Sequence, residues 1–280
     1  MDIYRCMIVF VGIFAICHAK CWPRSNWARL RIDTANVVDL THEMNETSSL
    51  WPTITEYGFK MMDIFKGILT NGPFKFFLYS NYFTTNSLTG THADAPLQFN
   101  ELGKSAKDFE MKEMIAPGVV IDLVKDGDPV PRTSFISKAD IKAWERKHGR
   151  IRSGTIVLFR TGYGQYYWSD RDAYLGTKFR GLDARYVLQT PGIDPEAAKW
   201  LLEERCIAAV GIDNYTVDNG QDHGFHTHKV FADANVAVYE DLANLEKLLD
   251  KPKGFYVFAM PLKIKNGVGS PARIIAFLQN

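Results

Sequence analysis

The chain has 280 residues and a formal net charge of +1 at pH 7, with 46% hydrophobic and 23% charged residues. This length is long for one domain and short for two, and the hydrophobic fraction is sufficient for a sizeable buried core. The balanced charge and the lack of a basic cluster in the sequence exclude an electrostatic nucleic-acid binder.

The N-terminus has the pattern of a secretory signal peptide. Arg5 precedes an apolar run over residues 6–17, and Ala19 is a small residue at the cleavage-proximal position. The run is shorter than the roughly 20 residues that a membrane-spanning helix needs. We therefore predict a signal peptide over residues 1–19, a mature domain over residues 20–280 and secretion to the extracellular space.

Strand-like and helix-like segments alternate along the rest of the chain. Short apolar runs predict strands at residues 37–40, 119–124, 156–159, 207–212, 235–239, 255–260 and 273–278. One helix is predicted from Ser137 to about His148, and a second begins with Asp194 as its cap and Pro195 at its first position. No Pro/Gly/Ser-rich linker divides the chain, so the sequence favours a single α/β domain.

Residues 51–86 are rich in aromatic side chains. Such density is more often found in a core or a subunit interface than around a small ligand. We therefore expect this segment to be buried, either within the domain or between subunits.

Two cysteines, Cys21 and Cys206, remain after removal of the signal peptide. A disulfide between them and a buried free thiol at Cys206 are both compatible with the sequence. Asn45 begins an Asn-Glu-Thr glycosylation sequon, which makes it an expected acceptor in the secretory pathway. Asn214 begins a second sequon, but it lies in an apolar stretch and is expected to be inaccessible.

Residues 90–99 read Gly-Thr-His-Ala-Asp-Ala-Pro-Leu-Gln-Phe. In an extended segment, His92 and Asp94 would point to the same face because side chains alternate. An imidazole beside a carboxylate is a frequent beginning of a zinc or manganese site. A single histidine is more often structural, but the neighbouring carboxylate makes metal binding the favoured interpretation here.

This run resembles the signature of the cyclase family of metal-dependent hydrolases, which includes kynurenine formamidase and isatin hydrolase. The signature is His-x-Gly-Thr-His-x-Asp-x-Pro-x-His, and Leu88 and Gln98 stand at its first and last histidines. Further similar motifs follow in the family's order: Arg160-Thr161-Gly162, Gly211-Ile212-Asp213, His228 with Glu240, and Gly269-Ser270-Pro271-Ala272-Arg273. The resemblance implies one cyclase-like domain, with a mixed sheet or barrel-like core flanked by helices of the swivelling β/β/α type.

The resemblance also implies a set of metal ligands. Four of the family's five ligand positions are retained, at His92, Asp94, His228 and Glu240. Leu88, at the fifth position, offers no lone pair, so we expect one divalent cation, Zn²⁺ or Mn²⁺. Asp213 and Asp218 are expected to be hydrogen-bond acceptors near the pocket rather than ligands.

The family's proton-transfer histidine is missing, because Gln98 cannot exchange a proton at neutral pH. His226 lies two residues before His228, so in an extended segment both rings would face the same side. His226 is therefore a candidate substitute for the missing group. A solvent-exposed histidine loop is the alternative interpretation, and it is the preferred one.

By resemblance, the expected function is a secreted metal-dependent hydrolase of carbon–nitrogen amide bonds. N-formylkynurenine, a substrate in tryptophan catabolism, or a related aryl amide is the leading substrate class, with Trp51, Phe77 and Trp168 as expected pocket walls. Relatives form dimers or tetramers, so a homo-oligomer is expected, with no nucleic-acid or membrane partner. The alternative is a catalytically impaired family member that binds a small molecule or a protein.

Overall fold

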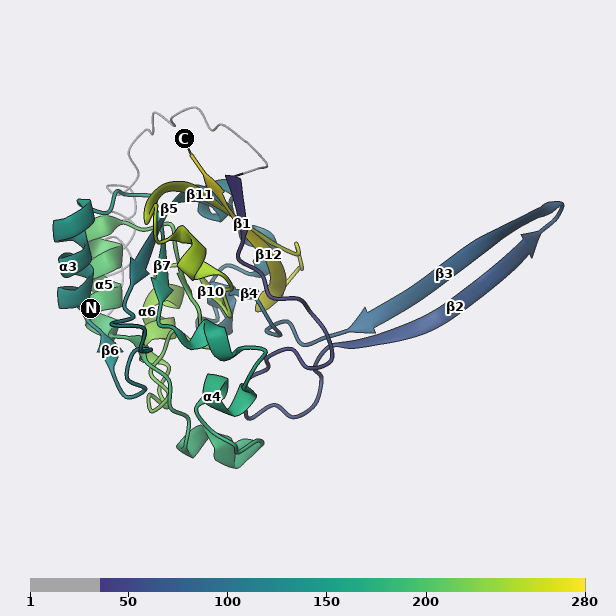
Figure 1. Ribbon diagram of the computed structural model, residues 1–280, viewed down its shortest axis with the longest axis horizontal. Helices are drawn as coiled ribbons and strands as arrows, with labels where there is room; N and C mark the ends of the chain where they lie inside the picture. Colours follow the sequence, from purple (N-terminus) through teal and green to yellow (C-terminus); the bar gives the residue numbers. More distant parts are fainter. Residues whose placement is uncertain (1–35, 280) are drawn as a thin grey trace, which may run out of the picture.

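The computed structural model describes residues 36–279 (Figure 1). The predicted signal peptide and Cys21 lie outside the described residues. Within residues 36–279, no helix is long and apolar enough to cross a membrane. Cys206 is disulfide-bonded, so of the two alternatives left open by the sequence, the free thiol at this position is wrong.

Eight strands form the main sheet. They are β1 (Val37–Asp39), β4 (His92–Asp94), β5 (Ile115–Asp122), β7 (Ile156–Arg160), β9 (Ala209–Ile212), β10 (Ala237–Glu240), β11 (Lys253–Pro261) and β12 (Gly269–Leu278). Their order is β1-β12-β11-β5-β7-β9-β10-β4, and β12 also pairs with β4. This additional pairing closes seven strands into a barrel-like sheet and leaves β1 outside the ring, paired with β12. The predicted mixed, barrel-like core is confirmed.

Alternate residues of the central strands enter two separate hydrophobic cores. In β7, Val157 and Phe159 pack beneath the helices, whereas Ile156 and Leu158 fill the interior of the barrel. Successive side chains of a strand point to opposite faces, so a strand buried on both faces needs apolar residues throughout. This requirement explains why the strands appear in the sequence as continuous apolar runs.

Helices α3 (Lys138–His148), α5 (Pro195–Trp200) and α6 (His226–Asp233) gather on one side of the sheet (Figure 1). The first two were predicted from the sequence, and α5 continues as a π-helical turn over Leu201–Arg205. The third helix replaces the extended segment or loop that was expected around His228. Other short elements include α2 (Met111–Met114), α4 (Arg171–Leu175) and the strand pair β6 (Phe135–Ile136) and β8 (Gly192–Ile193).

The start of α3 follows directly from its sequence. The Ser137 hydroxyl accepts a hydrogen bond from the backbone N–H of Asp140, and the Asp140 carboxylate accepts one from the backbone N–H of Ser137. This reciprocal pair satisfies two backbone donors that the first helical turn leaves without partners. The predicted cap of the second helix is also observed, because the Asp194 carboxylate accepts from Glu196 N.

The aromatic segment forms a long hairpin that projects from the body (Figure 1). Its strands, β2 (Lys60–Asn71) and β3 (Phe74–Thr84), make a two-stranded sheet separate from the barrel. Many of its large apolar side chains are exposed, including Phe77, which is 61% exposed. The expectation that this segment is part of the domain's own core is therefore wrong, and burial between subunits stays a prediction.

Candidate metal centre

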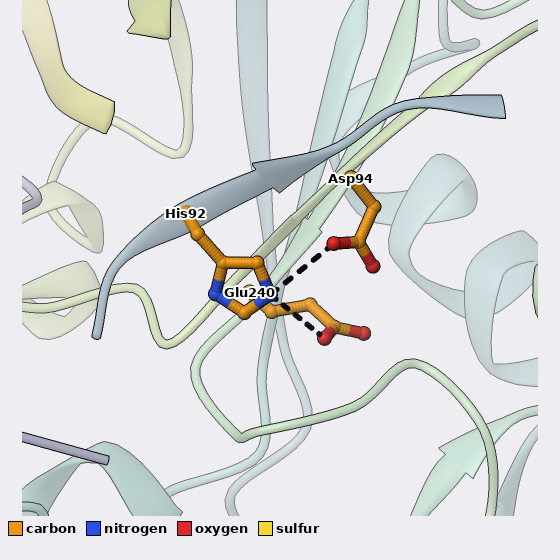
Figure 2. A group of neighbouring side chains, drawn as sticks. All are labelled: His92, Asp94 and Glu240. Atoms are coloured by element: carbon orange, nitrogen blue, oxygen red, sulfur yellow. Dashed lines mark ion pairs between the residues drawn. The ribbon is translucent and has the colours of Figure 1, made fainter. Parts of the chain in front are cut away.

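Four ligand-type side chains converge in one buried cluster, three of which are drawn in Figure 2. His92 Nε2 lies 3.3 Å from Asp94 Oδ1 and 3.4 Å from Glu240 Oε2. His228 Nε2 lies 3.1 Å from Asp94 Oδ2 and 3.2 Å from Glu240 Oε1. The structure thus brings together all four side chains that the sequence singled out as metal ligands.

The sheet positions three of these side chains. His92 and Asp94 are the first and last residues of β4, and their side chains share a face because they are two residues apart. β4 is antiparallel to β10, in a register that places His92 opposite Glu240. The fourth side chain, His228, comes from the first turn of α6. Strand pairing and one helix end therefore build the cluster.

Each carboxylate lies between the two imidazoles, and this arrangement shifts the pKa values of the side chains in the cluster. Burial would lower the pKa of His92, but the carboxylates of Asp94 and Glu240 raise it well above its usual value. Burial is likewise outweighed at His228, where Glu240 and Asp218 raise the pKa. Burial would raise the pKa of Asp94, but His92 and His228 lower it to about 2. In the metal-free cluster, the carboxylates therefore favour the protonated form of each imidazole.

The donor set fits a divalent cation. Two imidazole nitrogens and two carboxylates are ligands that zinc and manganese both accept. Around a tetrahedral ion with bond lengths of about 2.1 Å, neighbouring ligand atoms lie roughly 3.4 Å apart. The N–O separations of 3.1–3.4 Å in the cluster are of this size, but the two rings face different carboxylate oxygens: His92 faces Asp94 Oδ1 and Glu240 Oε2, and His228 faces Asp94 Oδ2 and Glu240 Oε1. One ligand atom each from His92, Asp94 and Glu240 also lie within 4.8 Å of one another.

Both imidazoles are held through their other nitrogen. His92 Nδ1 donates to the carbonyl oxygen of Gly90 at 2.7 Å, and His228 Nδ1 donates to the carboxylate of Asp218. With Nδ1 as the donor, Nε2 is left as the metal-binding atom on each ring. Asp218 was expected to be a hydrogen-bond acceptor near the pocket, and it also accepts from Thr227 N at 2.8 Å.

The two altered signature positions both lie beside Asp94. With its amide oriented to satisfy both groups, the Gln98 nitrogen donates to Asp94 Oδ1 at 3.1 Å and to Oδ2 at 3.3 Å. A Cβ added at Gly269 would lie 2.5 Å from Leu88 Cδ2 and 3.5 Å from Asp94 Oδ1. Leu88 therefore presents hydrocarbon at the edge of the cluster, and Gln98 holds a ligand without offering an exchangeable proton.

His226 does not join the cluster. His226 and His228 lie in the first turn of α6, where residues two apart do not face each other. The His226 ring is instead hydrogen-bonded to Asp222 at 2.7 Å, and its side chain is 66% exposed. The premise of an extended segment was wrong, and in this arrangement His226 does not replace the missing proton donor.

Aromatic rings border the cluster on the side of α6. Phe99 lies against His228 with ring centroids 4.6 Å apart, and Phe225 lies 5.2 Å from Phe99. Trp51 extends this wall, with its ring centroid 5.7 Å from that of Phe225. Of the three predicted pocket aromatics, only Trp51 belongs to this wall.

The other two predicted aromatics lie elsewhere. Trp168 packs edge-on against Tyr167 at 4.8 Å and near His42 at 6.1 Å. Phe77 is on the projecting β3, away from the cluster of its own chain (Figure 1). Sequence reasoning missed Phe99 and Phe225, although each lies within three residues of a singled-out position, Gln98 or His228.

The remaining family motifs support the sheet. The carboxylate of Asp213 accepts from Thr161 N at 2.7 Å and from Gly162 N at 2.9 Å, which ties β9 to the end of β7. Arg273 forms an ion pair of 2.6 Å with Asp39, which ties β12 to β1. These contacts are structural, as was expected for Asp213.

A closed α/β sheet with a buried cluster of two imidazoles and two carboxylates has the architecture of a metal-dependent hydrolase. The Cyclase family model matches residues 38–219, and the chain belongs to this family. Isatin hydrolase from Roseibium aggregatum is 34% identical over 219 residues, which are 75% of this chain and 77% of that protein. Kynurenine formamidase from Salinibacter ruber is 28% identical over 188 residues, 67% of this chain and 74% of that protein.

Solved structures agree with this assignment. Isatin hydrolase A from Ralstonia solanacearum superposes with a TM-score of 0.72 and 28% identity, covering 87% of this chain and 92% of that chain. An isatin hydrolase bound to the product analogue thioisatinate also gives a TM-score of 0.72 at 28% identity, covering 88% of this chain and 94% of that chain. The protein is therefore a cyclase-family hydrolase related to these enzymes.

Proposed function

We propose that this protein is a secreted enzyme that hydrolyses an aryl amide, such as N-formylkynurenine or an isatin-like cyclic amide. One Zn²⁺ or Mn²⁺ would be held by His92, Asp94, His228 and Glu240. The observation that carries the proposal is the convergence of these four side chains, with N–O separations of 3.1–3.4 Å, in a buried site.

The residues in and around the cluster would have different roles in such a reaction. A divalent cation bound here would supply Lewis acidity, which activates water and polarises the amide carbonyl. His92 and His228 would hold it through Nε2, in orientations fixed by Gly90 and Asp218. The rings of Phe99 and Trp51 offer apolar surface against which an aryl group can pack.

Departure of the amine is the step of this reaction for which the chain lacks a general acid at the signature position. A positioned general acid contributes about 10²- to 10⁴-fold in rate, and Gln98 cannot act as one. An aromatic amine is a weaker base than an alkyl amine, so it leaves with less help from a proton donor. This difference favours aryl amides as substrates.

The test combines metal analysis with hydrolysis of an arylformamide and of isatin, before and after chelation. About one zinc or manganese ion per chain, with turnover that chelation abolishes and metal restores, is the expected result. Protein without bound metal and without turnover would contradict the proposal. Bound metal without turnover would favour the second candidate, a binding protein, for which the replacements at Leu88 and Gln98 are the supporting observation.

Gln98→His provides a further prediction about the same reaction. The imidazole restores a group that can carry a proton at neutral pH, so kcat on the aryl amide should rise by about 10²-fold or more. Gln98→Asn, which keeps the amide chemistry, is the control and should give no increase. If Gln98→His keeps its metal but gains no rate, proton transfer at this position does not limit turnover.

The proposed secretion has a structural argument beside the N-terminal pattern. Cys206 is disulfide-bonded, and disulfides persist in oxidising compartments such as the secretory pathway. Expression with the complete N-terminus in a secretory host should therefore yield a chain that begins near Lys20, as measured by intact mass.

A further inference from the structure

Residues 138–152 carry a strong positive charge that the proposed chemistry does not use. The segment holds six basic residues and two acidic ones, so its net charge is +4, whereas the whole chain has a net charge of +1. The rest of the chain therefore has a net charge of −3. The expectation that the sequence lacks a basic cluster is wrong for this segment.

The segment forms α3 and the turn that follows it, on the side of the body opposite the hairpin of β2 and β3 (Figure 1). Ile141 and Trp144 are the buried residues of the helix, so its other side faces solvent. Lys138, Lys142 and Arg146 are exposed and four residues apart, a spacing that places them on one face of the helix. They form a row of basic side chains roughly 12 Å long.

Further basic side chains extend this row beyond the helix. Lys147 lies in the last turn of α3, and Arg150 and Arg152 are exposed in the turn that follows. Lys253, the first residue of β11, donates a hydrogen bond from Nζ to the carbonyl oxygen of His148 at the end of α3. Burial and the charges of Lys147 and Lys253 lower the pKa of His148. We call these seven side chains the basic row: Lys138, Lys142, Arg146, Lys147, Arg150, Arg152 and Lys253.

The fold does not neutralise the basic row. Within residues 36–279, none of its members forms an ion pair, because Asp140 caps α3 and Glu145 pairs with Arg205 at 2.7 Å. Like charges four residues apart destabilise a helix. The negative end of the helix can offset this cost in the last turn, but not at Lys138 in the first turn. The basic row therefore lowers the stability of α3, and an external anion would compensate its charge.

One aromatic ring orders part of the basic row. Lys138 Nζ lies 5.4 Å and Lys142 Nζ 5.8 Å from the centroid of the Trp200 ring. Contacts of this kind restrict a lysine side chain without removing its charge. Both ammonium groups therefore lose less conformational entropy when they bind an anion.

A narrow charged row without exposed apolar neighbours fits a linear polyanion. A helix that lies on a membrane inserts apolar side chains, and single-stranded nucleic acid stacks on aromatic rings. Neither mode fits residues 138–152, because the large apolar side chains Ile141, Trp144 and Ile151 are all buried. Duplex DNA is bound over a large and strongly positive area, whereas this surface is a single row.

We infer that the basic row is a docking surface for a sulfated polysaccharide. Short runs rich in lysine and arginine bind such chains, and arginine forks form paired hydrogen bonds with tetrahedral oxyanions. The choice of this polyanion rests on the proposed secretion, because sulfated polysaccharides lie outside cells. The metal cluster is built from β4, β10 and α6, so docking on α3 leaves its four ligand-type side chains in place.

The first test is calorimetric binding of the mature full-length chain to a heparin oligosaccharide of defined length, at several NaCl concentrations. Affinity should fall as salt rises, because polyanion binding releases counterions. Within residues 36–279, the side chains of Arg146, Lys147 and Arg152 make no hydrogen bond or ion pair, so their charges can be removed without loss of an internal contact. Arg146→Gln/Lys147→Gln/Arg152→Gln should bind about 10-fold or more weakly at physiological salt. Its slope of log K against log [NaCl] should be shallower by about 2.

Lys75→Gln/Lys263→Gln/Lys265→Gln is the matched control. These three lysines are exposed, and they lie on β3 and in the turn between β11 and β12, outside the basic row. Their replacement removes the same net charge, so unchanged binding would locate the site on α3. Far-UV circular dichroism and metal content check that each variant is folded, and both should match the wild type.

Three further probes separate the possible sources of the anion: the same oligosaccharide after desulfation, a DNA duplex, and phosphatidylserine vesicles. Weaker binding to all three is expected. Equal or tighter binding of any of them would overturn the inference. So would a wild-type chain without salt-sensitive binding to the oligosaccharide, or an equal loss in the two triple variants. None of these measurements uses turnover or the signal peptide, so failure of this inference is separate from failure of the proposed function.

Discussion

Asp218 and Asp222 each hold a histidine ring through Nδ1, but only Asp218 serves the metal cluster. Asp218→Asn would place an amide N–H opposite His228 Nδ1 and favour the tautomer that carries its proton on Nε2. That proton would occupy the metal-binding atom. We expect a loss of about 10- to 100-fold in metal affinity, measured by competition with a fluorescent chelator.

Asp222→Asn is a matched control for that substitution. It changes the same type of pair in the same segment, but its partner His226 is exposed and outside the cluster. Metal affinity should remain unchanged. An equal loss in both variants would mean that Asp218 acts on the segment as a whole and not on the His228 ring.

The charges of the cluster predict that metal binding releases protons. The carboxylates raise the pKa of His92 and His228 well above its usual value, so we expect both rings to hold protons at neutral pH in the metal-free protein. A cation binds the neutral ring, so affinity should rise with pH until the raised pKa is passed. Asp94, with a pKa of about 2, stays ionised between pH 5 and 8 and releases no proton.

Calorimetric titration with Zn²⁺ in buffers of different ionisation enthalpy measures this release. Between one and about two protons per ion are expected at pH 7, and His92→Gln should release fewer. Binding without proton release, or affinity that falls as pH rises from 6 to 7.5, would contradict the assigned protonation state of the cluster.

The site residues differ in how far the sequence could predict them. His92 and Asp94 follow from spacing, because two residues apart in a strand means one shared face. His228 and Glu240 are distant in the chain, so only the family resemblance joined them to the site. The carbonyl of Gly90 and the wall residues Phe99 and Phe225 depend on tertiary packing, which no local pattern encodes.

At the scale of elements, the strands and two helices were predictable because each has a local physical cause. Buried strands need apolar runs, and Ser137 and Asp194 are good caps. The third helix, α6, lacks such a signal: Phe225 stands at its N-terminal boundary in a left-handed conformation without a side-chain cap. The hairpin of β2 and β3 was missed because apolar pairs on both of its faces, Ile68 with Phe77 and Leu69 with Phe76, remove the polar–apolar alternation of a half-solvated strand.

Closure of the barrel depends on close packing between β4 and β12. A Cβ at Gly269 would approach Leu88 Cδ2 to 2.5 Å and the carbonyl oxygen of Ala93 to 2.8 Å. Gly269→Ala should lower the free energy of unfolding by about 1–3 kcal/mol, as overpacking does. It should also weaken metal binding, because Gly269 is paired with Asp94.

Urea unfolding of the metal-free protein measures this effect on stability. Gly58→Ala is the control, since the nearest atom to its added Cβ is 4.0 Å away. Equal stabilities for the two variants would show that β12 can shift without loss.

At the scale of the whole molecule, composition limits the class of protein but not the location of its apolar surface. A content of 46% hydrophobic residues predicts a large core, and residues 36–279 contain three buried hydrophobic clusters. The same composition also supplies the hairpin of β2 and β3, many of whose large apolar side chains are exposed. Only the three-dimensional structure distinguishes the apolar residues that are buried in the core from those that are exposed on the hairpin.

The route of the whole chain through the cell can be tested with its two sequons. Asn45 lies in a surface turn with an exposed Thr47, whereas Asn214 is fully buried and donates to the carbonyl of Pro191 at 3.1 Å. If the chain enters the secretory pathway, the folded protein should carry one glycan, at Asn45. Treatment with a peptide N-glycosidase should lower the mass of the wild type but not that of Asn45→Gln.

Asn214→Gln separates glycosylation from folding in this experiment. Its buried amide is lost, so secretion should fall, but any secreted molecules should still carry the glycan at Asn45. A secreted chain without glycan would show that the Asn45 turn is inaccessible to the transferase. A chain that stays inside the cell with its N-terminus intact would contradict the signal peptide, while the metal cluster, which lies wholly within residues 92–240, would be unaffected.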